Sequence, residues 1–275
     1  MTPLKGKTAV ITGAASGLGR AMALAFAGEG MNLCLADLDQ KGVEETLRLV
    51  GDKNVKASSA HVDVSKGEEV EAFASRLQEV HLVCNNAGVA LGGAAWENSV
   101  DDWRWILGVN LWGVIHGVRV FAPRLIAQGE GHIVNTASVA GLISPAGSAA
   151  YNVTKHAVVT LSETLHHDLR EHRSAVGVSV LCPAYVPTGI AQSERNRPAG
   201  FRKGERSAQS RAREAMVAQA VAKGKLTADD VARAVVSAVM ENRFYVLTHP
   251  RIKGAIQARM EDILHDRAPR NPLAL

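Results

Sequence analysis

Three residues in the middle of the chain, Ser138, Tyr151 and Lys155, have the types and the spacing needed to move a proton. If a helix begins near Ser148, Tyr151 and Lys155 lie on one face, with the ammonium beside the phenol. A neighbouring cation favours the phenolate, so we expect a lowered pKa for Tyr151. Ser138, at a strand end, can hydrogen-bond an oxygen as a carbonyl and an alcohol interconvert. The alternative is that Tyr151 and Lys155 are an exposed polar pair with no catalytic role. The rest of the sequence must therefore show whether a catalytic site surrounds them.

A glycine-rich loop, G-A-A-S-G-L-G at residues 13–19, follows a short strand predicted at residues 7–12. Glycines let a backbone approach a pyrophosphate, and the free amides of the next helix attract it. Because a second strand, residues 31–36, follows and ends in an acidic residue, the pattern predicts a dinucleotide site. The predicted contacts in the loop are Gly13, Ser16, Gly17, Leu18 and Gly19.

The acidic residue after the second strand, Asp37, predicts a preference for NAD over NADP. Its carboxylate can accept hydrogen bonds from both ribose hydroxyls, and its charge would repel a 2′-phosphate. No basic residue stands in the loop before Gly17, and Leu38 follows Asp37. The alternative is that Asp37 caps the helix predicted at residues 39–50.

Strands and helices alternate along the rest of the chain. We expect further strands at residues 55–62, 80–84, 131–136, 176–182 and 244–247, and helices at residues 66–79, 100–128, 148–171 and 227–241. This alternation predicts an α/β fold, a doubly wound parallel sheet of about seven strands with helices on both faces. Ligands of such sheets bind at the carboxyl ends of the strands, where the polar residues named above fall.

Composition and length predict one globular domain over residues 1–275. A charged segment, residues 189–225, is predicted to be a partly helical, mobile lid over the substrate, and residues 251–275 to be a tail with one amphipathic helix. We find no apolar run that reaches the roughly 18 residues of a membrane span, so we expect a cytoplasmic protein without a membrane partner.

Neither charge nor cysteine content points to another class of function. The net charge is +4, and the basic residues between Arg195 and Arg213 predict a solvated segment rather than a nucleic-acid site, since Phe201 is the only aromatic residue among them. Cys34, Cys84 and Cys182 lie in apolar runs and are expected to be buried, with no disulfide and no metal site.

Two further groups of polar residues interrupt apolar elements. Asn85 and Asn86, followed by Ala87 and Gly88, end a predicted strand and could tie neighbouring strand ends together, or simply form a turn. Asn110 lies within an apolar helix, where a polar residue needs a partner and marks a kink, a bound water or a site.

Together these motifs closely resemble the short-chain dehydrogenase/reductase family, in its single-domain branch with an NAD(P)-binding Rossmann fold. The resemblance covers the chain from Lys5 to about Pro250. It rests on Thr12-Gly13-x-x-x-Gly17-x-Gly19, Asp63-Val64, Asn85-Asn86-Ala87-Gly88, Asn110, Ser138, Tyr151-x-x-x-Lys155 and Cys182-Pro183.

The resemblance implies a catalytic role for four residues. Tyr151 would transfer the proton, Ser138 would hold the substrate oxygen, Lys155 would bind the nicotinamide ribose and lower the pKa of Tyr151, and Asn110 would fix a water in a proton relay. It also implies NAD contacts at Asp63, Val64, Asn86, Ala87, Gly88, Tyr151, Lys155, Val186 and Thr188. One departure is Ala184, followed by Tyr185, where the family usually has glycine after Pro183; this change would reshape the pocket.

The stretches at residues 103–138 and 190–198 are also similar to a bacterial subgroup that includes enzymes oxidising secondary alcohols of bulky aromatic compounds. An apolar pocket would be formed by Val89, Leu91, Leu142, Tyr185 and Ile190. We therefore expect an NAD-dependent oxidoreductase that interconverts a hydrophobic or aromatic secondary alcohol and its ketone, with Tyr151 as general acid/base.

The alternative is a non-catalytic dinucleotide-binding sensor or scaffold of the same fold, which needs the glycine loop and Asp37 but not the four polar residues. The resemblance also implies a homo-oligomer, a tetramer or a dimer joined through two long helices. Such an assembly would explain apolar residues such as Trp112 and Val159 outside the core-facing stripe.

Overall fold

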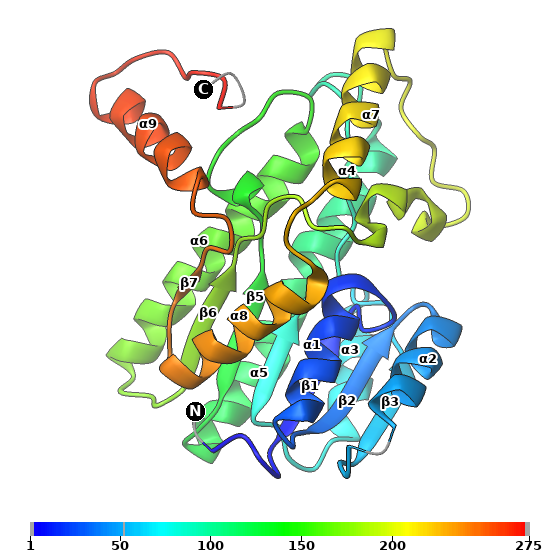
Figure 1. Ribbon diagram of the computed structural model, residues 1–275, viewed down its shortest axis with the longest axis vertical. Helices are drawn as coiled ribbons and strands as arrows, with labels where there is room; N and C mark the ends of the chain where they lie inside the picture. Colours follow the sequence, from blue (N-terminus) through cyan, green and yellow to red (C-terminus); the bar gives the residue numbers. More distant parts are fainter. Residues whose placement is uncertain (1–2, 52, 273–275) are drawn as a thin grey trace.

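One sheet of parallel strands runs through the molecule in the order β3-β2-β1-β4-β5-β6-β7 (Figure 1). The computed structural model describes residues 3–51 and 53–272; the predicted domain's residues 1–2, 52 and 273–275 lie outside the described ones. The strands are β1 (Thr8–Thr12), β2 (Asn32–Asp37), β3 (Ala57–His61), β4 (Leu82–Asn85), β5 (His132–Thr136), β6 (Gly177–Leu181) and β7 (Tyr245–Val246). The predicted doubly wound α/β fold is confirmed.

Helices cover both faces of the sheet (Figure 1). The helices α1 (Gly17–Gly28), α2 (Gln40–Val50) and α8 (Ala228–Glu241) share one apolar core with the sheet, and α3 (Gly67–Ser75), α5 (Gly113–Gln128) and α6 (Ala149–Glu171) share another. The strand order reverses between β1 and β4, so the chain leaves these strands in opposite directions. In open α/β sheets, such a point opens a crevice at the carboxyl ends of the strands.

The helical stretch between β4 and β5 is long and rich in apolar residues. It consists of α4 (Val100–Leu107), a π-helix η1 (Gly108–Trp112) and α5. Contrary to the sequence prediction, this stretch is long and apolar enough, by length and composition only, to cross a membrane. Its apolar residues have another use in the fold, because Phe121 and Leu125 pack in the core against Ile133 of β5.

Two details of the helices differ from the prediction. Helix α3 ends at Ser75 rather than near residue 79, because Arg124 of α5 donates hydrogen bonds to the carbonyls of Ala74 (2.6 Å) and Leu77 (2.5 Å) and so closes its last turn. Val159 of α6 is only 5% exposed and packs inside the chain's own core, so it needs no neighbouring subunit. Trp112, in contrast, is 50% exposed.

Residues 189–225 contain two helical segments, η3 (Gly189–Asn196) and α7 (Ala208–Ala222), and the tail contains α9 (Ile252–Leu264). The expectation of a solvated basic segment is wrong for two of its arginines. The side chains of Arg197 and Arg206 are 10% and 4% exposed, because both pair with the carboxylate of Asp102 in α4. This basic cluster is therefore largely occupied by contacts within the chain.

Candidate active site

Helix α6 and the end of β5 bring Ser138, Tyr151 and Lys155 together, as the sequence predicts. Tyr151 and Lys155 lie one turn apart in α6, with Nζ of Lys155 5.7 Å from the centre of the Tyr151 ring. Ser138 caps a short 3-10 turn, Val139–Gly141, directly after β5, and its hydroxyl donates to the carbonyl of Pro183 (3.3 Å). All three side chains line one cleft at the carboxyl edge of the sheet.

Burial sets the pKa of both titratable groups in this trio. It raises the pKa of the Tyr151 phenol, and the neighbouring Ser138 side chain offsets part of this effect. It lowers the pKa of Lys155 to about 8. The predicted lowering of the Tyr151 pKa is not found, because the phenol is buried and the ammonium donates to the carbonyl of Thr136 (2.9 Å). At neutral pH the phenol therefore holds its proton, beside a buried cation.

The π-helix η1 is centred on Asn110, which is fully buried. Its side-chain oxygen accepts from the amide of Val89 (2.8 Å), and its nitrogen donates to the carbonyl of Val89 (2.9 Å) and to Thr154 (3.2 Å). The hydroxyl of Thr154 in turn donates to the carbonyl of Tyr151 (2.8 Å). Asn110 thus connects the loop after β4 to the first turns of α6, next to the proposed catalytic groups.

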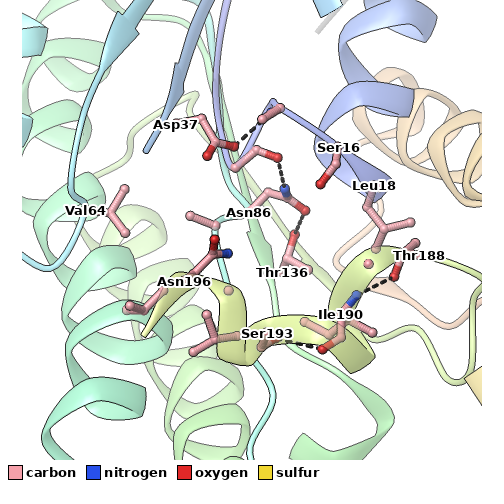
Figure 2. Close-up of a pocket in the computed structure, with 18 of the residues that line it drawn as sticks. Ser16, Leu18, Asp37, Val64, Asn86, Thr136, Thr188, Ile190, Ser193 and Asn196 are labelled. Carbon is pink, nitrogen blue, oxygen red and sulfur yellow. Dashed lines mark hydrogen bonds between the residues drawn. The ribbon is translucent and has the colours of Figure 1, made fainter. Parts of the chain in front are cut away.

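The glycine loop after β1 lies directly against the loop after β4. Gly13 has a φ of +67°, and a Cβ there would lie 2.7 Å from the Cα of Ala87, so only glycine fits without displacement. Asn86 fastens the strand ends as predicted: its amide donates to the hydroxyl of Thr12 (2.9 Å), and its side chain donates to the carbonyl of Thr12 (3.0 Å) and accepts from Thr136 (3.3 Å; Figure 2).

Asp37 lies at the end of β2 and lines the cleft. Its carboxylate accepts from the amides of Ala15 (2.8 Å) and Asp39 (2.9 Å), so it also holds the glycine loop in place. It does not cap helix α2; the cap is Asp39, which accepts from the amide of Gly42 (3.0 Å). The alternative role as a helix cap is therefore wrong.

One cleft contains both the trio of Ser138, Tyr151 and Lys155 and the glycine loop with Asp37. Its empty volume is about 1320 Å³, including the open mouth. Nearly all the predicted cofactor contacts line it: Gly13, Ser16, Gly17, Leu18, Asp37, Asp63, Val64, Asn86, Ala87, Gly88, Tyr151, Lys155, Val186 and Thr188. Gly19 does not line the cleft. A Cβ on Gly19 would lie 2.0 Å from the carbonyl oxygen of Gly13, so this glycine lets the loop fold back on α1.

Sequence reasoning missed several residues of the cleft. Thr136 provides the carbonyl that receives the Lys155 ammonium, and Trp105 and Ser193 line the cleft from α4 and η3. Of the predicted apolar pocket, Val89 and Ile190 line this cleft, whereas Leu91, Leu142 and Tyr185 are not among its described lining residues. No sequence signal marks Ser193 or Trp105, since their positions depend on how the segment after β6 folds over α4.

A family model described as short chain dehydrogenase matches residues 7–199. The chain belongs to this family. The match includes the glycine loop, Asp37, Asn110 and the Ser138, Tyr151 and Lys155 trio, so the motifs that shape the cleft are those of short-chain dehydrogenases.

Known proteins resemble this short-chain dehydrogenase over nearly its whole length. A short chain dehydrogenase/reductase from Burkholderia phymatum, solved in complex with NAD, is 49% identical over 100% of both chains, with a TM-score of 0.96. A CLA biosynthesis dehydrogenase/reductase of Lactiplantibacillus plantarum is 32% identical, over 98% of this chain and 97% of its own. A 1-deoxy-11-beta-hydroxypentalenate dehydrogenase of Streptomyces exfoliatus is 32% identical, over 94% of this chain and 89% of its own. This short-chain dehydrogenase is thus an oxidoreductase that acts on CH–OH groups of small molecules.

Proposed function

We propose that this enzyme interconverts a hydrophobic secondary alcohol and its ketone, with NAD as the hydride partner and Tyr151 as general acid/base. The observation that supports it most is the convergence of Ser138, Tyr151 and Lys155 in the same cleft as the glycine loop. A non-catalytic dinucleotide-binding protein would not need this trio beside the cofactor site.

During alcohol oxidation each of these side chains has a distinct task. Ser138 holds the alcohol oxygen by a hydrogen bond, and Tyr151, once it has released its own proton, takes the hydroxyl proton as the carbonyl forms. A bound NAD would supply the hydride acceptor for this oxidation. Lys155, a buried cation one turn from Tyr151, stabilises the phenolate and holds the ribose, and Asn110 fixes the backbone that carries Tyr151. In ketone reduction the same residues act in reverse, with Tyr151 as the proton donor.

The donor set of the cleft fits a dinucleotide. The amides at the start of α1 are free to bind a diphosphate, and the Asp37 carboxylate lines the cleft where a ribose would lie. NAD is favoured over NADP because of this carboxylate. The guanidinium of Arg20 reaches the same loop, but it donates to Thr46 (3.0 Å) and to the carbonyls of Gly42 (3.1 Å) and Ala15, which leaves it less free for a 2′-phosphate.

The substrate end of the cleft is apolar. Val89, Trp105 and Val109 line the cleft and belong to the same apolar cluster as Tyr151, and the cleft lining also includes Ile190 and Val221. Apolar walls of this kind favour a substrate with a bulky hydrocarbon or aromatic body. The name of the Streptomyces exfoliatus relative, 1-deoxy-11-beta-hydroxypentalenate dehydrogenase, agrees with a hydroxylated substrate.

We further propose that residues 1–275 act as one domain, that residues 189–225 form its lid, and that the protein assembles as a dimer or tetramer. The half-exposed Trp112 and Val153, 50% and 48% exposed, support an interface over η1 and α6. Light scattering on the purified protein would test the assembly, and a monomer at all concentrations would exclude it.

The proposed activity is tested with purified protein, NAD and a panel of aliphatic, aromatic and polycyclic secondary alcohols, with the absorbance of NADH as the readout. Turnover of the bulky apolar members is expected. If NAD binds but no alcohol is oxidised and no matching ketone is reduced with NADH, the catalytic proposal fails.

A further inference from the structure

A second cluster of buried charges lies outside the catalytic trio, at the first turn of α4. Asp102 is 0% exposed, and its Oδ2 accepts from the amide of Ser99 (3.0 Å), which closes a capping box with the Ser99 side chain. Capping a helix requires no further partner. Asp102 nevertheless binds three groups from the lid segment, residues 189–225.

Those three contacts reach both ends of the loop that joins η3 to α7. Oδ1 of Asp102 pairs with Arg197 (2.7 Å), directly after η3, and Oδ2 pairs with Arg206 (3.2 Å), two residues before α7. Oδ2 also accepts from the amide of Gly204 (2.9 Å). Such buried charges are costly unless paired, so removing the carboxylate leaves two buried arginines without their common partner.

Arg197 links this cluster to the cofactor cleft. Its guanidinium lies 4.5 Å from the centre of the Trp105 ring, and Trp105 lines the cleft. Arg197 also pairs with Glu194 of η3 (2.9 Å). Because Arg197 follows Asn196, the last residue of η3, fixing its side chain fixes that end of η3.

The remainder of η3 is held against the rim of the cleft. The hydroxyl of Ser193 accepts from the amide of Ala90 (2.8 Å), in the loop after β4. At the other end of η3, Thr188 contacts the glycine loop, since a Cβ on Gly17 would lie 3.2 Å from its Cβ. Figure 2 shows Ile190, Ser193 and Asn196 along the edge of the pocket that faces Asp37 and Asn86.

We propose that Asp102 is a positioning residue for the cofactor: by holding Arg197 and Arg206, it keeps η3 closed over the dinucleotide cleft. Asp102 is not among the described residues that line the cleft. The inference rests on the proposed function, since it takes the cleft to be an NAD site. Its consequence is that NAD affinity depends on a carboxylate that lies outside that site.

The test compares Asp102→Asn with Asp230→Asn. Asp230 is the matched control because it occupies the same capping-box position in α8, next to Thr227, and contacts no lid residue among the described contacts. If the lid is closed in only about a tenth of the Asp102→Asn molecules, the Kd for NADH rises about tenfold. Fluorescence titration measures this Kd. The KM for NAD rises in parallel, with much less change in kcat.

Limited trypsin digestion gives a readout independent of activity. The carbonyl of Arg202 accepts from Ser99 (2.6 Å) and the amide of Gly204 donates to Asp102, which protects the bonds after Arg202 and Lys203. Faster cleavage there is expected in Asp102→Asn but not in Asp230→Asn. If Asp102→Asn fails to fold, Arg197→Gln is measured in the same way, because it breaks the contact from the lid side and leaves Asp102 paired with Arg206.

The outcomes separate the two proposals. Wild-type protein that binds NADH, with an Asp102→Asn variant that binds NADH equally well and is cleaved equally slowly, overturns the role of Asp102 alone. Wild-type protein that does not bind NADH overturns the proposed cofactor, and the role of Asp102 with it.

Discussion

Replacing Lys155 by methionine is expected to inactivate the enzyme and to make it more stable. The Lys155 side chain is 4% exposed, and burial lowers its pKa from 10.5 to about 8. At neutral pH, folding therefore buries a cation that the unfolded chain keeps in water. The difference between these two pKa values corresponds to about 3 kcal/mol, at about 1.4 kcal/mol for each factor of ten in affinity for the proton.

Methionine is of similar length and carries no charge, so the substitution removes this cost. It also loses the hydrogen bond to the carbonyl of Thr136 (2.9 Å), which contributes about 1 kcal/mol. The net gain in the free energy of unfolding is about 2 kcal/mol, which raises Tm by about 4 °C in a chain of this size. Activity is lost because the phenolate of Tyr151 then has no neighbouring cation.

The gain should also depend on pH. Between the folded-state pKa of about 8 and the unfolded-state value of 10.5, Lys155 holds its proton more tightly in the unfolded wild type than in the folded one. The free energy of unfolding of the wild type therefore rises with pH in this range. The variant lacks this contribution, and its advantage at about pH 7 should shrink by about 1 kcal/mol at about pH 9. Thermal unfolding of both proteins without cofactor measures this. A variant less stable than wild type at neutral pH, or an advantage independent of pH, would refute the reasoning.

Three further substitutions test other parts of the account. Asp37→Ala should lower the ratio of kcat/KM for NAD to that for NADP about tenfold, through lost ribose hydrogen bonds; a wild type that already prefers NADP would contradict this. Gly117→Ala places a Cβ 1.9 Å from Oδ1 of the buried Asn85 and should cost about 2 kcal/mol in chemical denaturation, whereas Gly28→Ala, with nothing within 4 Å, should not destabilise. Ser138→Ala should lower kcat about 100-fold and leave the Kd for NADH unchanged; an equal loss of NADH affinity would argue for a structural role.

The parts of the site that depend on local sequence could be predicted. The spacing of Tyr151 and Lys155 in a helix, the strand and glycine loop before α1, and the polar residues at strand ends all follow from the periodicity of single elements. The parallel sheet orders these ends along one edge, so residues far apart in the chain meet there. For this reason the predicted fold and the predicted residues of the cleft agree with the structure, whereas the predicted lowering of the Tyr151 pKa does not.

The features that depend on tertiary contacts could not be predicted. A basic run around Arg197 and Arg206 has the same sequence pattern whether it is solvated or paired, and its partner Asp102 lies about a hundred positions away in the chain. The pKa of Tyr151 depends on burial that no spacing reveals. Similarly, the apolar Val159 matches an interface residue in sequence, yet it packs inside its own chain.

The central claim is that Tyr151 moves the proton while the cofactor carries the hydride, and Tyr151→Phe tests it most directly. The variant removes one hydroxyl and keeps the ring, so it should bind NADH with nearly the wild-type Kd. Its kcat for the best alcohol of the panel, measured by the absorbance of NADH, should fall by about 100-fold to 10,000-fold. Turnover near the wild-type rate, in a variant that binds NADH normally, would contradict the assignment of Tyr151 as general acid/base.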